Sequence, residues 1–70
     1  MAISYNGLWK LLIDKNMKKL ALKEKVGFST GTLAKLSKNE YVALSVLERI
    51  CETLDCQIGD IVAYIPEKKQ

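Results

Sequence analysis

A very short connection between two helical patterns is the feature that most limits how this chain can fold. Apolar side chains at helical spacing mark residues 19–26 as one helix, and a second helical pattern follows after only Gly27, Phe28 and Ser29. Gly27 fits the left-handed residue that ends a helix, and Ser29 fits the residue that caps the next one. So short a connection forces the two helix axes to cross at a steep angle. The sequence therefore predicts a helix-turn-helix, with Phe28 directed into the core.

The remaining apolar residues predict three more helices around the same core. Ser4 fits the cap of the first helix, which we expect to end at Asn16. The start of the fourth helix is open, because Leu44 already belongs to its apolar stripe whereas Ser45 and Glu48 match a capping box. The inward residues of the five helices, in chain order, are Leu8, Leu12 and Ile13 (widened by Trp9 and Leu11); Leu22 and Val26; Leu33 and Leu36; Leu44, Leu47, Ile50, Cys51 and Leu54; and Ile58, Ile61 and Val62.

Five short helices joined by connections of two to six residues predict a small, compact all-α fold. Each helix is too short to be stable alone, so all of them depend on one shared core. We expect a single domain over residues 1–70, with the helix-turn-helix at about 19–37 and a flexible tail at 66–70. Tyr64 and Ile65 could extend as a strand, but the signal is too short to assign.

The charge is divided unevenly along the chain. Residues 1–39 hold eight lysines and two carboxylates, a net charge of +6, whereas residues 40–70 hold three basic and six acidic side chains, a net charge of −3. A basic half beside an acidic half suggests that one face meets a polyanion. The alternative is a lysine-rich surface that is merely solvated.

Other classes of function find little support in the composition. The chain has no His, and Cys51 and Cys56 alone cannot complete a zinc site, so we expect no metal, no cofactor and no catalysis. Cys51 lies on an apolar helical stripe, which favours a buried, reduced thiol. No apolar run approaches about 18 residues and no export signal follows the N-terminus, so we expect a cytoplasmic protein.

The second helix of the predicted motif has the residues that a DNA groove requires. In a helix-turn-helix the N-terminal end of this helix enters the major groove, where only small or polar side chains fit. Lys35 lies one turn after Gly31, on the same outward face, and can reach a base edge or a phosphate. The small and polar residues at the start of the helix are Ser29, Thr30, Gly31 and Thr32.

A set of short motifs extends this reading to residues 5 to about 62. They are Tyr5-Asn6, 8–17, Gly27, Ser29, 32–36, Lys38-Asn39-Glu40, Val46-Leu47, Ile50-Cys51-Glu52, Leu54-Asp55-Cys56 and 58–61. As an ensemble they resemble the small single-domain members of the Cro/repressor-type (XRE-class) helix-turn-helix regulators. The resemblance implies a five-helix, lambda-repressor-like domain that regulates transcription by binding operator DNA, usually as a homodimer.

The resemblance also implies roles for individual residues. It assigns base contacts to Ser29, Thr30, Thr32 and Lys35, phosphate contacts to Lys19, Lys38 and Asn39, and the turn to Gly27. Three positions depart from the family pattern: Lys23 replaces an Ala, Lys18 replaces a Ser or Thr cap, and Gly31 stands where a base-reading side chain often lies. We therefore expect modest base discrimination from side chains, with a larger share of the affinity from phosphate contacts and DNA shape.

Two hypotheses about the function of this fold remain open. The chain could be a sequence-specific DNA-binding repressor that occupies a promoter, or a protein-interaction module of the adaptor or antitoxin type. The second would carry an acidic or apolar recognition helix, which Thr30, Thr32 and Lys35 do not provide. If the basic half docks on DNA, the dimer seam is expected in the acidic half, near the fourth and fifth helices and Tyr64-Ile65. Trp9 is expected in the core rather than stacked on a base.

Overall fold

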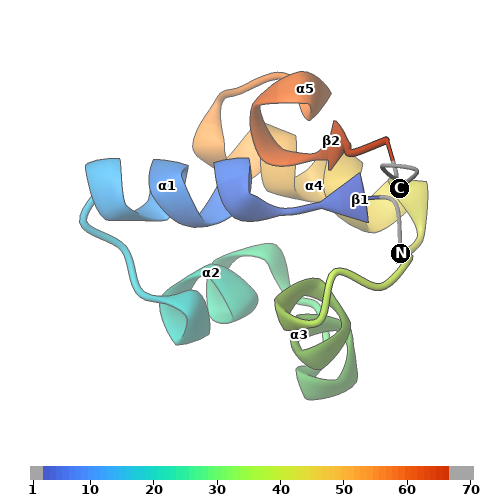
Figure 1. Cartoon of the computed structure of the whole chain (residues 1–70). Helices are drawn as coiled ribbons and strands as arrows, with labels where there is room; N and C mark the ends of the chain where they lie inside the picture. The colour runs from blue at the N-terminus through green and yellow to red at the C-terminus, as the bar shows by residue number, and fades with distance from the viewer. Residues whose placement is uncertain (1–2, 67–70) are drawn as a thin grey trace.

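Residues 3–66, the part of the chain that the structure describes, form five helices and a two-stranded ribbon. The structure is a computed structural model. In chain order the elements are β1 (Ile3–Ser4), α1 (Asn6–Asp14), α2 (Lys19–Val26), α3 (Thr30–Ser37), α4 (Leu44–Leu54), α5 (Ile58–Ile61) and β2 (Ala63–Tyr64). Figure 1 shows α2 and α3 together on one side of the molecule, and α1, α4 and α5 on the other. The mostly helical, five-helix fold is thus confirmed. The expected flexible tail lies, apart from Pro66, outside the described residues.

One apolar core joins all five helices. Fully burying a Leu or Ile side chain stabilises the fold by about 1.5–3 kcal/mol, which offsets the short length of each helix. Phe28 enters the core from the turn, as predicted, and Tyr5 enters it from the residue before α1. The buried apolar residues are Tyr5, Leu8, Leu12, Leu22, Val26, Phe28, Leu36, Val46, Leu47, Ile50, Leu54 and Ile61.

Three residues predicted to point inward are exposed: Ile13, Leu44 and Ile58, of which Ile58 is 39% exposed. For Ile13 and Leu44 the reason is that the inward stripes are narrower than the sequence suggested. Ile13 is 75% exposed, since it lies about 100° around α1 from the buried Leu12. Leu44 is 69% exposed, since it lies about 120° around α4 from the buried Ile50. Val46, which the stripe left out, is buried in its place.

The predicted helix ends are partly confirmed. Gly27 has a φ of 90° and ends α2 in the left-handed conformation. Ser4 precedes the cap position of α1, which is Tyr5, but its hydroxyl still accepts a hydrogen bond from the Asn6 backbone N–H at 3.2 Å. The capping box proposed for α4 is absent from that helix, which begins at Leu44 without a side-chain cap.

A capping box occurs instead at α5, where we did not predict one. The Asp60 carboxylate accepts a hydrogen bond from the Gln57 backbone N–H at 2.9 Å, and the Gln57 side chain accepts one in return. This reciprocal pair starts a helix of only four residues and fixes its position after α4.

The two strands pair although they lie at opposite ends of the described chain. β1 runs antiparallel to β2, with Ile3 opposite Tyr64 and Ser4 opposite Ala63. Figure 1 shows this ribbon beside α4 and α5. The ribbon is an addition to the predicted all-α class, and it closes the end of the domain that lies away from α2.

Candidate nucleic-acid interface

The turn between α2 and α3 fixes the start of the exposed helix α3. Ser29 is its N-cap, and the Ser29 hydroxyl oxygen accepts a hydrogen bond from the Thr32 backbone N–H at 3.1 Å. The same hydroxyl donates to the Thr32 hydroxyl at 3.2 Å. Ser29 and Thr32, both predicted to contact bases, therefore also hold the first turn of the helix together. The Thr32 hydroxyl keeps its own proton free to donate to a ligand.

One face of α3 points away from the core. Leu36 is buried, and at 100° per residue Gly31 and Ala34 lie about 140–160° around the helix from it. Thr30 and Lys35 lie about 100–120° from it, at the two edges of the outward face, and all four residues are exposed. Thr32 lies at the flank of this face and is half-buried. Ala34 was not predicted as a site residue. Its position two residues before the buried Leu36 was the signal that it points outward. Its methyl group is suited to contact a thymine methyl group in the major groove.

The loop after α3 is tied to the core by one buried tyrosine. The Tyr5 backbone N–H donates to Asn39 Oδ1 at 3.0 Å, and the Tyr5 hydroxyl donates to the Glu40 carbonyl oxygen at 2.8 Å. Burial raises the pKa of the Tyr5 hydroxyl above its ordinary value, although the Val42 backbone acts in the opposite direction. The hydroxyl is therefore a protonated donor at neutral pH.

This arrangement orients the Asn39 amide. Because a backbone N–H can only donate, its partner on Asn39 is the oxygen, and the amide nitrogen remains as the second donor of this side chain. Asn39 has a φ of 59°, in the left-handed region that asparagine tolerates. Lys38, at the C-cap of α3, is exposed beside it. Both predicted phosphate-contacting residues thus lie at the C-terminal end of α3, and Asn39 has a structural role that the sequence did not reveal.

The third predicted phosphate-contacting residue lies at the start of α2. Lys19 is the first residue of that helix, and its Nζ atom is 4.3 Å from the centroid of the Trp9 ring. Trp9 is half-buried and packs against the core, which agrees with its expected position. Lys18 occupies the N-cap without a side-chain hydrogen bond, as its departure from the family pattern suggested.

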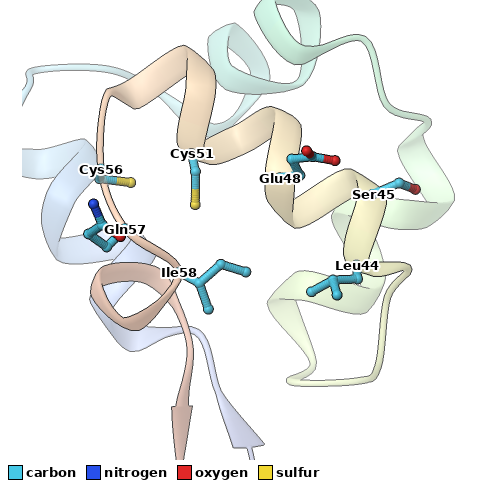
Figure 2. Close-up of a pocket in the computed structure, with 7 residues that line it drawn as sticks. All are labelled: Leu44, Ser45, Glu48, Cys51, Cys56, Gln57 and Ile58. Carbon is cyan, nitrogen blue, oxygen red and sulfur yellow. The ribbon is translucent and has the colours of Figure 1, made fainter.

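The opposite half of the molecule carries a hollow between α4 and α5. It has a volume of about 480 Å³, and Figure 2 shows the residues that line it: Leu44, Ser45, Glu48, Cys51, Cys56, Gln57 and Ile58. Cys51 and Cys56 are free thiols, each half-buried rather than fully buried as expected for Cys51. Burial, together with the neighbouring Cys51, raises the pKa of Cys56 to about 11, so Cys56 is a neutral thiol at physiological pH.

Residues 3–66 contain neither a cluster of metal-binding side chains nor a membrane-spanning helix. Within that range no three His, Cys, Asp or Glu side chains gather as a metal-binding group. No helix among the described residues is long and apolar enough to cross a membrane.

Comparison with known proteins agrees with this geometry. Residues 7–67 match the family model of the Cro/C1-type HTH DNA-binding domain. The chain is 39% identical over 56 residues to the uncharacterized HTH-type transcriptional regulator YozG of Bacillus subtilis (strain 168), which covers 77% of this chain and 67% of that protein. It also resembles the crystal structure of the transcriptional regulator VanUg, with a TM-score of 0.91 and 59% identity, over 94% of this chain and 88% of that one.

Proposed function

Because this chain belongs to the family of Cro/C1-type helix-turn-helix DNA-binding domains, we propose that it represses transcription by occupying operator DNA as a homodimer. The family is one of DNA-binding domains, and both relatives are described as transcriptional regulators. The observation that carries the finer proposal is the outward face of α3, where Thr30, Ala34 and Lys35 are all exposed. The protein acts by binding and not by catalysis, in the cytoplasm where the DNA lies.

The proposed docking places α3 in the major groove. The first helix of such a motif crosses the DNA backbone while the second reads base edges. Lys35 would read a base, and Lys38 with the Asn39 amide nitrogen would bind phosphate at the far end of the helix. Thr30 and Ala34 offer only a hydroxyl and a methyl group, so base discrimination by side chains is modest. Phosphate contacts and DNA shape then supply most of the affinity.

The acidic half supports the proposed dimer. Among the described residues of this half, five large apolar side chains are exposed: Tyr41, Leu44, Ile58, Tyr64 and Ile65. We take Leu44, Ile58, Tyr64 and Ile65 as the apolar face of the proposed dimer. Leu44 and Ile58 also line the hollow between α4 and α5. A second copy seated on this apolar face would set two α3 helices in successive major grooves, on the order of 34 Å apart. One copy alone would contact few phosphates and bind weakly at physiological salt.

A selection experiment tests the proposed function. The purified protein is used to select from a random duplex library at about physiological salt, because affinity depends on the salt concentration. An enriched inverted repeat supports a dimeric, sequence-reading regulator and identifies its operator. Binding that is equal for all sequences and sensitive to salt contradicts specific readout. A protein that selects no DNA at all favours the protein-interaction alternative on the same fold.

Two lysine substitutions distinguish base recognition from phosphate binding. Lys35→Ala is expected to relax base preference at one operator position, with a cost of about 1–3 kcal/mol for the preferred base. Lys38→Ala is expected to weaken binding to all sequences alike and to reduce the slope of log K against log salt by about 0.9. Lys25→Ala, an exposed lysine near the end of α2, serves as the control and should change neither property. Equal effects of the first two changes on every sequence would contradict base reading by Lys35.

Asn39→Asp tests which end of the Asn39 side chain binds DNA. The carboxylate still accepts the hydrogen bond from the Tyr5 backbone N–H, so the melting temperature should change little. The amide nitrogen donor is replaced by a negative oxygen, so DNA binding is expected to weaken by about tenfold or more. Thr53→Asp, on the exposed surface of α4, changes the net charge equally and is the control. If both variants bind DNA alike, Asn39 serves the fold alone.

A further inference from the structure

We propose that Trp9 is a positioning residue that holds the Lys19 ammonium group ready for a DNA phosphate. The inference rests on the proposed function and adds a residue outside the helix-turn-helix to its DNA-binding machinery. Its basis is the approach of Lys19 Nζ to 4.3 Å from the centre of the Trp9 ring. A cation at that distance over an indole face is attracted by the negative potential of the ring.

The two side chains differ in how firmly the fold holds them. Trp9 lies in the middle of α1, next to the buried Leu8, and its half-buried ring packs against the core. Lys19 is exposed and carries its charge on a flexible four-carbon chain. The ring is therefore the fixed partner, and the contact restricts the ammonium group to one place on the surface before any DNA arrives.

Restricting the lysine in advance strengthens a later contact with an anion. Ordering a flexible side chain on binding weakens an interaction, by about two- to tenfold in affinity for each side chain immobilised. The contact with Trp9 already orders the Lys19 side chain in the free protein, so less ordering remains to be done when DNA binds. An ammonium group has three N–H donors, so the face of the ring leaves donors free for phosphate oxygens.

The surroundings of Lys19 favour an anion as the next partner. α2 has no acidic residue in its first turn, and its N-cap is the exposed Lys18, whose side chain makes no capping hydrogen bond. Trp9, Lys18 and Lys19 line one open hollow of about 290 Å³, which a DNA strand can approach. The first helix of the motif is also the one that crosses the DNA backbone.

A double-mutant cycle tests the coupling between the two side chains. Trp9→Leu, Lys19→Met and the double variant are compared with the wild type by fluorescence anisotropy on a labelled duplex at several salt concentrations. Lys19→Met is expected to weaken binding and to reduce the salt slope by about 0.9. Trp9→Leu should weaken binding about two- to tenfold when Lys19 is present and should add nothing when it is absent. Additive losses in the double variant would overturn the proposal.

Further variants show whether a loss of affinity comes from the contact with Lys19 or from a disturbed fold. Trp9→Phe retains a ring and should recover part of the affinity that Trp9→Leu loses. Trp9 is the only tryptophan in the chain, so its fluorescence reports on Lys19 directly. Lys19→Met should change the fluorescence of the free protein, whereas Lys25→Met should not. Unchanged fluorescence in Lys19→Met would overturn the proposal.

The same variants separate this inference from the proposed function. If Lys38→Ala weakens DNA binding but Lys19→Met leaves affinity and salt slope unchanged, the role of Trp9 and Lys19 is refuted and DNA binding stands. If the wild type binds no duplex, the proposed function and this inference both fail.

Discussion

Replacing Gly7 by alanine is expected to cost this small domain about 1–3 kcal/mol of its folding free energy. A Cβ atom at Gly7 would overlap the carbonyl oxygen of Asp60 and lie 3.2 Å from the carbon of that carbonyl. Both atoms belong to the backbone of α5, so no side chain can rotate to make room. Moving α5 would draw Ile61, which is fully buried, out of the core. The strain is therefore distributed between two helices that pack directly on each other.

Thermal unfolding followed by circular dichroism measures this loss. In a domain of 60–100 residues, 1 kcal/mol shifts the melting temperature by about 4–8 °C, so a shift of that size or larger is expected. Gly59→Ala is the matched control, because a Cβ at Gly59 meets no atom within 4 Å. That helix position should gain up to about 1 kcal/mol from the lower flexibility of alanine. Equal melting temperatures for the two variants would contradict the close contact between α1 and α5.

Features that depend on neighbours in the sequence could be predicted. The left-handed end of α2 follows from Gly27, and the cap of α3 follows from Ser29 three residues before Thr32. The burial of Leu22 and Leu36 follows from helical spacing within one element. In each case the signal and its structural consequence lie within one or two helical turns.

Features that depend on distant contacts could not be predicted. Nothing near Gly7 indicates that α5 will pass against it, and nothing near Ile3 indicates that it will pair with Tyr64. The exposure of Ile13 and Leu44 depends on which neighbouring helices fail to cover them. Helical periodicity predicts the direction in which a side chain points from its helix. It does not predict how much of the helix surface the neighbouring helices and strands bury.

The candidate site also has local features that could be predicted and long-range features that could not. The exposure of Thr30 and Lys35 on one helix face is a local property and follows from the spacing of Leu36. The attachment of Asn39 to Tyr5 joins residues 34 positions apart, and it gives a predicted ligand-binding side chain a second role. The contact between Lys19 and Trp9 joins two helices. Each residue could therefore be assigned a position or role from the sequence, but their contact with each other could not be predicted.

The largest expected effect on DNA binding comes from a residue that does not face DNA in our proposal. Ile58→Asn is expected to convert the proposed dimer to a monomer and to weaken binding to an inverted-repeat operator by about 100-fold or more. Ile58 begins α5, is 39% exposed, and lines the hollow as one of the residues of the proposed dimer face. An amide at that position would have to lose its water on dimer formation without a designed partner. The loss is large because joining two binding modules raises overall affinity by about 10²–10⁴ without any new contact.

Sedimentation and DNA titration together measure this effect. Ile58→Asn should sediment as a monomer at concentrations where the wild type is a dimer, while circular dichroism keeps its helical signal. Its affinity for a single half-site should match that of the wild-type protein, because α3 is unchanged. Ile13→Asn is the matched control for sedimentation: Ile13 is 75% exposed but lies on α1, outside the apolar face of the acidic half. If Ile13→Asn abolishes the dimer and Ile58→Asn preserves it, the seam lies elsewhere. If the wild type is itself a monomer on its operator, affinity must come from one copy, and Ile58→Asn should then leave operator binding unchanged.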